Sequence, residues 1–307
     1  MADLEPALAA LRDGAAGGTP MIEMSPAQAR ERVAAGHHLC ADGPAVDVRD
    51  LGPDEGPGPT VRVYLPVAPA TPVATLVYAH GGGWVTGDLD YADELCRFVA
   101  DAGVRVVSVD YRLAPEHPYP AGLDDVAAAW AWARQRYDGP VGLGGDSAGG
   151  NLAAAVALRA AADAPADFLL LLYPVLAAPG STPSYTTQGT AFPIGEAEMR
   201  WFLEHYSGSP EAGDAAGPDL FPLLSGDLGT LPPTHVVVVE HDPLHDEGVA
   251  FAAALREAGV PVTLERHPDL CHGFLRFTAA SPRSREARDA VVDAVRRLAA
   301  SGAEVQP

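Results

Sequence analysis

Ser147 lies at the centre of Gly145-Asp146-Ser147-Ala148-Gly149, between a short apolar run and an alanine-rich helical pattern. A serine nucleophile in this position needs a tight strand-to-helix turn that projects its hydroxyl, and the flanking glycines leave room for neighbouring backbone. The N–H of Ala148, at the start of the helix, would point toward a negatively charged oxygen formed beside the serine. The alternative is a glycine-rich turn with an incidental serine.

A second glycine-rich segment, His80-Gly81-Gly82-Gly83-Trp84, follows another apolar run. Three consecutive glycines leave backbone N–H groups uncovered, as the oxyanion hole of an acyl-transfer enzyme requires, although a flexible loop is the simpler alternative. Which of the three glycines would donate stays open. Trp84, directly after the loop, is predicted to contact substrate.

A serine nucleophile needs a histidine as its base and a carboxylate that orients the histidine. In α/β proteins that carry both of these glycine motifs, the carboxylate follows the serine along the chain and the histidine comes last. Asp242 follows the apolar run at 235–240, and Pro243 keeps the chain out of a helix there. His272 lies in a loop beside Gly273, which permits a tight backbone. We therefore predict Asp242 and His272 as partners of Ser147.

Other acids and histidines are open to structural explanations. Two further carboxylates, Asp246 and Glu247, are expected to begin the next helix, where negative charge interacts favourably with the helix N-terminus. Three further histidines are interpreted as structural or solvent-facing: His241, His245 and His267. Cys271, beside His272, is either a reactive thiol or, more in keeping with apolar surroundings, a buried inert one.

Short apolar runs alternate with helical patterns, which predicts a mostly parallel sheet flanked by helices. We expect eight strands, at 46–50, 61–65, 73–79, 104–110, 141–144, 168–173, 235–240 and 262–267. The run at 61–65 alternates polar and apolar residues, as in a half-exposed antiparallel edge strand. Helices are expected at 91–102, 123–137, 148–162, 196–206, 246–258 and 284–299, and another begins with Ser25 as its N-cap.

Two segments interrupt this alternation and predict a helical cap. The expected organisation is 1–43 as the N-terminal part of the cap, 44–176 as core, 177–233 as a cap insertion, and 234–307 as the rest of the core. Apolar side chains of the cap segments would line a substrate pocket or pack cap helices: Met21, Met24, Phe192, Met199, Trp201, Phe202 and Tyr206.

The 307 residues include 41 acidic and 20 basic side chains, a net charge of −21, and every basic residue is arginine. Without lysine the chain cannot form a Schiff base, a P-loop or a Ser-x-x-Lys site. The negative charge argues against nucleic acid and against stable membrane association, because both use clustered cationic side chains. An uncharged or weakly polar small substrate fits this balance better.

Three cysteines form neither a disulfide framework nor a zinc spacing, which favours a reducing compartment. The first residues carry Asp3 and Glu5, unlike a secretory signal, and no apolar run approaches the roughly 20 residues that span a bilayer. We expect a soluble, cytoplasmic protein, and a homodimer is left open.

Five ordered blocks carry a family resemblance: HGGGW at 80–84, DYRLAPEHPYPAGLDD at 110–125, GDSAGGN at 145–151, DPL at 242–244 with an acid at 246, and HGF at 272–274. The chain resembles the hormone-sensitive-lipase-like bacterial carboxylesterases, within the α/β-hydrolases, from about residue 61 onward. The one departure noted is at 245, where such proteins often carry arginine in place of this histidine.

The resemblance implies a serine carboxylesterase for short- to medium-chain acyl esters that needs no metal or organic cofactor. It implies a catalytic triad of Ser147, Asp242 and His272. It also implies an oxyanion hole formed by the N–H groups of Gly82, Gly83 and Ala148. The block at 110–120 is expected to brace the site through Arg112, Glu116 and its prolines. Two alternatives remain: a deacetylase or amidase using the same triad, and a non-catalytic ligand receptor on the same fold.

Overall fold

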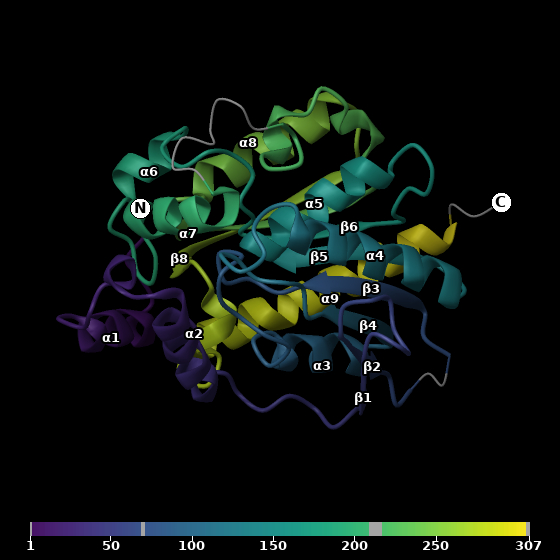
Figure 1. Cartoon of the computed structure of the whole chain (residues 1–307), viewed down its shortest axis with the longest axis horizontal. Coiled ribbons are helices and arrows are strands. Elements are labelled where there is room, and N and C mark those ends of the chain that lie inside the picture. The colour runs from purple at the N-terminus through teal and green to yellow at the C-terminus, as the bar shows by residue number, and fades with distance from the viewer. Residues whose placement is uncertain (1, 69–70, 209–216, 305–307) are drawn as a thin grey trace.

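The protein is built on one eight-stranded sheet in the order β1-β2-β4-β3-β5-β6-β7-β8 (Figure 1). The structure, a computed structural model, describes residues 2–68, 71–208 and 217–304. The strands are β1 (Asp47–Leu51), β2 (Val61–Leu65), β3 (Ala74–Ala79), β4 (Val104–Val109), β5 (Val141–Asp146), β6 (Leu169–Leu172), β7 (Thr234–His241) and β8 (Val262–Cys271). Of these described strands, β2 alone runs against the others.

The eight predicted strands are confirmed, with small shifts at most ends and a longer β8. The prediction that 61–65 forms the edge was wrong. β1 pairs antiparallel along the outside of β2, from Asp47 opposite Leu65 to Leu51 opposite Val61, and is itself the edge strand. The alternation of polar and apolar residues in β2 therefore reflects its antiparallel position next to the edge.

Helices cover both faces of the sheet. One face carries α3 (Asp93–Asp101) and α9 (Pro282–Glu304), and the other carries α4 (Ala121–Arg136), α5 (Ala148–Ala160) and α8 (His245–Glu257). Successive strand residues point to opposite faces, so Leu170 and Leu172 join the core under α3 and α9, whereas Leu169 and Leu171 join the core under α4 and α5. Burial on both faces explains why the central strands are continuously apolar.

Local sequence explains the helices near the N-terminus. In α2 (Pro26–Ala35) the Ser25 hydroxyl accepts a hydrogen bond from the Gln28 N–H, the Gln28 Oε1 accepts one from the Ser25 N–H, and Pro26 opens the helix. The sequence predictions for α2 are confirmed, but α1 (Pro6–Ala15) was missed. The sequence signal for α1 is the same as for α2, an N-cap residue followed by proline. Glu5 precedes Pro6, and its carboxylate accepts a hydrogen bond from the Leu8 N–H.

The segments predicted as a cap gather at one end of the sheet. Figure 1 shows α1 and α2 near α7 (Glu196–Ser207) and α6 (Pro183–Thr187). The 3₁₀ turn η1 (Met21–Glu23) contacts α7, and the Phe192 ring stacks on Phe277 at 5.6 Å. Leu8 of α1 is instead buried in the core cluster that includes α9, so the first 43 residues do not serve the cap alone. The exact domain boundaries stay a prediction.

Further short 3₁₀ turns are η2 (Gly36–Leu39), η3 (Pro222–Leu224), η4 (Leu228–Thr230) and η5 (Phe274–Phe277). None of the helices in the described ranges has both the length and the apolar character needed to cross a membrane.

Candidate active site

Three side chains predicted to act together meet at the carboxyl ends of neighbouring strands. Ser147 follows β5, Asp242 follows β7 and His272 follows β8, and the parallel arrangement brings these strand ends to one edge. Nε2 of His272 lies 2.9 Å from the Ser147 Oγ, and its Nδ1 lies 2.8 Å from Oδ2 of Asp242. All three residues are buried, so water competes little with either hydrogen bond.

The turn at Ser147 is strained in the way the glycine pattern predicted. Ser147 has φ +54°, in the left-handed region that residues with side chains rarely adopt. A Cβ on Gly145 would collide with the Gly149 backbone, and a Cβ on Gly149 would collide with the carbonyl oxygen of Ala79. Glycine at both positions therefore permits the sharp turn that presents the serine hydroxyl to His272.

The carboxylate of Asp242 is fixed through both oxygens. Oδ1 accepts a hydrogen bond from the Leu244 N–H at 2.9 Å, which leaves Oδ2 for His272. The Tyr173 ring also contacts the imidazole, edge-on at 4.9 Å between centroids. This arrangement places the Nδ1 proton toward Asp242, so that Nε2 faces the serine as an acceptor.

The glycine loop after β3 is anchored so that two of its three N–H groups remain uncommitted. The Gly81 N–H donates to Oδ1 of Asp146 at 2.9 Å, and the Tyr78 hydroxyl donates to the same atom. No acceptor in the described part of the chain receives the N–H of Gly82, Gly83 or Ala148. Asp146 thus ties the loop to the serine turn and selects Gly82 and Gly83 as the available donors.

Two ionisable groups around this loop have strongly shifted pKa values. Burial raises the pKa of Asp146 from 3.8 to about 6, although the hydrogen bonds from Tyr78 and Gly81 partly oppose that rise. Burial likewise lowers the pKa of His80 to about 4. His80 stacks on Tyr111 with centroids 4.4 Å apart, so it is a neutral packing element of the loop.

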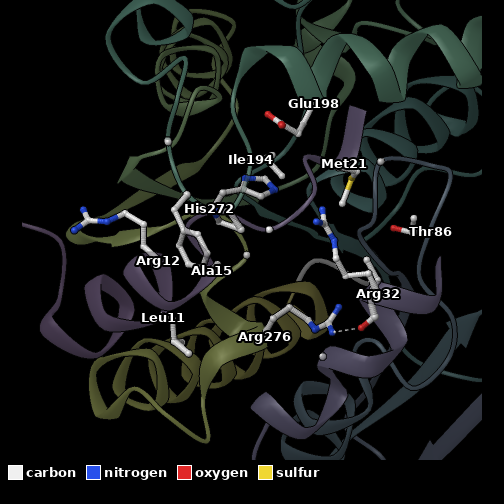
Figure 2. A pocket seen from close by; sticks show the side chains of 18 of the residues that line it. Leu11, Arg12, Ala15, Met21, Arg32, Thr86, Ile194, Glu198, His272 and Arg276 are labelled. Atoms are coloured by element: carbon white, nitrogen blue, oxygen red, sulfur yellow. Dashed lines mark hydrogen bonds between the residues drawn. The ribbon is translucent and has the colours of Figure 1, made fainter. Parts of the chain in front are cut away.

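A cavity of about 760 Å³ opens at Ser147 and His272. Its walls come from the glycine loop, the N-terminal segment, the chain around α7 and the turn after His272, as Figure 2 shows. Of the cap side chains proposed from sequence, four line the cavity: Met21, Phe192, Met199 and Phe202. The lining does not include Met24, Trp201 and Tyr206, which pack against the hydrophobic core. Packing was the second of the two roles considered for these side chains from sequence.

Trp84 does not line the cavity, which contradicts the prediction that it contacts substrate. Its side chain is 1% exposed, and its indole stacks on the Tyr206 ring with centroids 4.5 Å apart. The backbone of Trp84 has φ +61°, so the chain turns sharply at the end of the glycine loop. That turn buries the indole beneath the cap helix α7.

The two carboxylates after Asp242 hold the fold around the site. Asp246 accepts a hydrogen bond from the Ser184 N–H at 2.8 Å, and buried Glu247 accepts one from the Leu176 N–H at 2.7 Å. Both interactions join α8 to the chain that leads into the cap insertion. Burial raises the pKa of Cys271, which agrees with an inert thiol.

The three histidines interpreted from sequence as structural or solvent-facing each contact another residue. Nε2 of His267 pairs with Glu265 at 2.9 Å, His245 Nδ1 lies 3.0 Å from the Val239 carbonyl oxygen, and His241 Nε2 lies 3.1 Å from the Ala2 carbonyl oxygen.

The block at 110–125 braces the loop from behind. The Tyr111 hydroxyl donates to the His80 carbonyl at 2.8 Å, and the Ala114 N–H donates to the Trp84 carbonyl at 2.9 Å. Arg112 pairs with Asp125, while Glu116 pairs with Arg30 of α2. The block therefore holds the glycine loop and ties it to the N-terminal segment.

Among the described residues, one group of side chains could hold a metal ion. Ligand atoms of His37, Asp88 and Asp90 lie within 4.8 Å of one another. None of the three lines the cavity at Ser147.

Comparison with known proteins identifies relatives over most of the chain. A family model described as the alpha/beta hydrolase fold matches residues 76–276. The chain is 41% identical over 270 residues to the carboxylic ester hydrolase LipN of Mycobacterium tuberculosis, covering 82% of this chain and 70% of LipN. It is 38% identical to carboxylesterase NlhH of the same organism, covering 82% of each. A solved esterase structure from Pyrobaculum calidifontis matches with a TM-score of 0.87 and 33% identity, over 96% of this chain and 99% of that one.

The family resemblance in the five sequence blocks is thus confirmed by independent matches in sequence and in structure. The chain belongs to the hormone-sensitive-lipase-like carboxylesterases of the α/β-hydrolase superfamily.

Proposed function

We propose that the protein is a serine carboxylesterase that hydrolyses short- to medium-chain acyl esters. The observation that carries the proposal is the continuous hydrogen-bonded chain from Ser147 through His272 to Asp242, at 2.9 and 2.8 Å, at the wall of a large cavity. The family membership supports the same activity. Because all three members of this hydrogen-bonded series are present, an enzyme is favoured over a ligand receptor.

Acylation begins when Ser147 Oγ attacks the ester carbonyl while Nε2 of His272 accepts the serine proton. The Asp242 carboxylate stabilises the imidazolium and keeps its Nδ1 proton in place. The carbonyl oxygen becomes an oxyanion that accepts hydrogen bonds from the N–H groups of Gly82, Gly83 and Ala148, each donor contributing about 10²- to 10³-fold in rate. His272 then gives its proton to the leaving alcohol oxygen.

Deacylation repeats the sequence with water. The imidazole of His272 takes a proton from a water molecule that attacks the acyl-enzyme carbonyl, and it returns that proton to Ser147 Oγ as the acid leaves. A hydroxyl, an imidazole, a carboxylate and backbone N–H groups perform every step. This agrees with a chain that contains no lysine.

The direct test is the Ser147→Ala variant assayed on a short-chain aryl ester. The substitution removes the nucleophile without adding bulk, so the variant should lose turnover while keeping its unfolding midpoint. Wild-type turnover in Ser147→Ala would overturn the proposal. Matched ester and amide substrates separate an esterase from a deacetylase or amidase, because the amide requires protonation of a poorer leaving group.

A cytoplasmic location and a homodimer are also proposed. Cys40, Cys96 and Cys271 are all free thiols, which suits a reducing compartment. The outer edge of β8 has no partner strand in the described ranges, and unpaired edges readily pair with a second copy. Light scattering on the purified protein tests the dimer, and a monomer mass at working concentration would refute it. The charge of −21 supports the absence of a nucleic-acid partner.

A further inference from the structure

The cavity at Ser147 has a local charge that differs from that of the whole chain. Four of its lining residues carry a formal charge at neutral pH: Arg12, Arg32, Arg276 and Glu198. The chain as a whole has a net charge of −21, which by itself favours an uncharged substrate. Three arginines against one carboxylate make the lining of this cavity cationic.

Arg276 is the arginine nearest in sequence to the catalytic groups, four residues after His272 in η5. Its guanidinium donates to the Val33 carbonyl oxygen at 3.0 Å and lies over the Tyr91 ring at 4.1 Å. Its buried Nε has no hydrogen-bond partner in the described structure, and its charge interacts with Tyr91, Cys40 and, through space, Asp146, although none of the described carboxylates lies within ion-pair distance of it. A partly buried guanidinium without an ion-pair partner is costly, so an anion that arrives with a ligand would stabilise this position.

Arg32, on α2, is the second arginine of the cavity lining for which the described residues offer no carboxylate partner. Its guanidinium donates to the Thr19 carbonyl oxygen at 2.8 Å. Figure 2 shows Arg32 pointing toward the middle of the cavity on the side of Met21, and Arg276 reaching along the lower wall. The two guanidinium groups therefore approach the same space from separate elements.

The remaining charged residues of the cavity already have partners. Arg12 pairs with Asp13 at 2.8 Å, is half exposed, and points away from His272 in Figure 2. Glu198 accepts a hydrogen bond from the Gly195 N–H at 2.9 Å, which caps α7 on the opposite wall. Arg32 and Arg276 are thus the two cationic groups of the lining that have no carboxylate partner among the described residues.

We infer that the ester hydrolysed at Ser147 carries a carboxylate, which Arg276 and Arg32 bind. The inference rests on the proposed esterase function and specifies its substrate class. A guanidinium presents a planar set of donors that matches a carboxylate, and hydrogen bonds between two charged groups are stronger than those between neutral ones. The negative charge of the chain then belongs mainly to its surface, while the cavity selects an anionic ester.

Two pairs of chromogenic or phenolic esters test the inference, each pair differing only in a carboxylate or its neutral amide. On the acyl side, p-nitrophenyl hydrogen adipate is compared with p-nitrophenyl adipamate. On the alcohol side, para-acetoxybenzoate is compared with para-acetoxybenzamide. The measured quantity is the ratio of kcat/KM for the acid to that for the amide, with Ser147→Ala as the blank, so that any general loss of activity cancels.

In at least one pair the wild-type ratio should be about 10 or more, because hydrogen bonds to a charged group are the stronger ones. Arg276→Gln and Arg32→Gln should each lower that ratio about 10-fold, and Arg276→Lys should retain part of it. Arg12→Gln is the matched control and should change the ratio less than about twofold, since Arg12 is exposed and already paired. Arg32 is exposed on α2, so its variant tests the inference even if Arg276→Gln folds poorly.

A ratio near one or below in both pairs would overturn the inference while leaving the esterase function intact. So would a preference for the acid that survives both glutamine variants. If the wild type hydrolyses none of the four esters above the Ser147→Ala blank, the proposed function itself fails and the inference fails with it.

Discussion

Replacing Asp242 by Asn tests the proton arrangement of the site with almost no change in shape. Oδ1 accepts the Leu244 N–H at 2.9 Å and Oδ2 faces Nδ1 of His272 at 2.8 Å. An amide has one acceptor for these two donors. If its oxygen stays with Leu244, its NH₂ faces Nδ1, and the imidazole proton must move to Nε2. Nε2 is then a donor toward the Ser147 hydroxyl and cannot accept its proton.

The opposite orientation of the amide restores the tautomer but sets its NH₂ against the buried Leu244 N–H, at a cost of about 1–3 kcal/mol. The charge that stabilises the imidazolium is lost in either case. Together these effects should lower kcat about 10⁴-fold, which corresponds to about 5 kcal/mol in the barrier.

The assay is steady-state turnover of p-nitrophenyl butyrate by Asp242→Asn, with urea unfolding as the check on folding. We expect KM to change little, because neither tautomer alters the cavity. A fall in kcat of less than about tenfold in a folded variant would refute the assigned role of Asp242, since the wrong tautomer could not then dominate.

Two further predictions concern the glycine loop. Gly83→Ala should lower kcat by about 10²-fold or more, because Gly83 has φ +61° and a Cβ there would overlap the Phe202 ring; kcat within about threefold of wild type would contradict the donor role. Asp146→Asn should flatten the dependence of stability on pH. The pKa of Asp146 is raised from 3.8 to about 6, so the folded state retains a proton that the unfolded state loses, and stability should fall by about 2 kcal/mol as pH rises from about 4 to about 6. Urea unfolding across that pH range measures the free energy of unfolding of the wild type and of Asp146→Asn. Equal slopes of this free energy against pH in the two proteins would contradict the raised pKa of Asp146.

Local pattern and spacing were enough to predict much of the site. Gly145 and Gly149 were predicted from the space that a strand-to-helix turn requires, and the collisions expected of a Cβ at either position confirm that reason. Asp242 and His272 could be placed because each follows an apolar run that forms a strand, and parallel strands end at one edge. The local pattern did not choose among Gly81, Gly82 and Gly83, and although the family resemblance implied Gly82 and Gly83, the physical reason is the hydrogen bond from Gly81 to Asp146.

Features that depend on contacts distant in sequence were beyond prediction. Trp84 was expected at the substrate because it adjoins the glycine loop, yet a left-handed backbone turn directs its indole toward Tyr206 of α7. The edge strand was misassigned because the burial of 61–65 depends on β1 pairing beside it. The cationic character of the cavity combines Arg32 of α2 with Arg276 after His272, two positions that no local pattern connects.

The central claim is that Ser147 is the nucleophile that forms an acyl-enzyme, and covalent trapping tests it most directly. Intact-mass spectrometry after treatment with a p-nitrophenyl alkylphosphonate should show a single adduct, located at Ser147 by peptide mapping, with p-nitrophenol released in equal amount and esterase activity lost in step. Ser147→Ala should remain unlabelled. A wild-type protein that hydrolyses esters but forms no adduct, or one that is labelled equally in Ser147→Ala, would contradict the account.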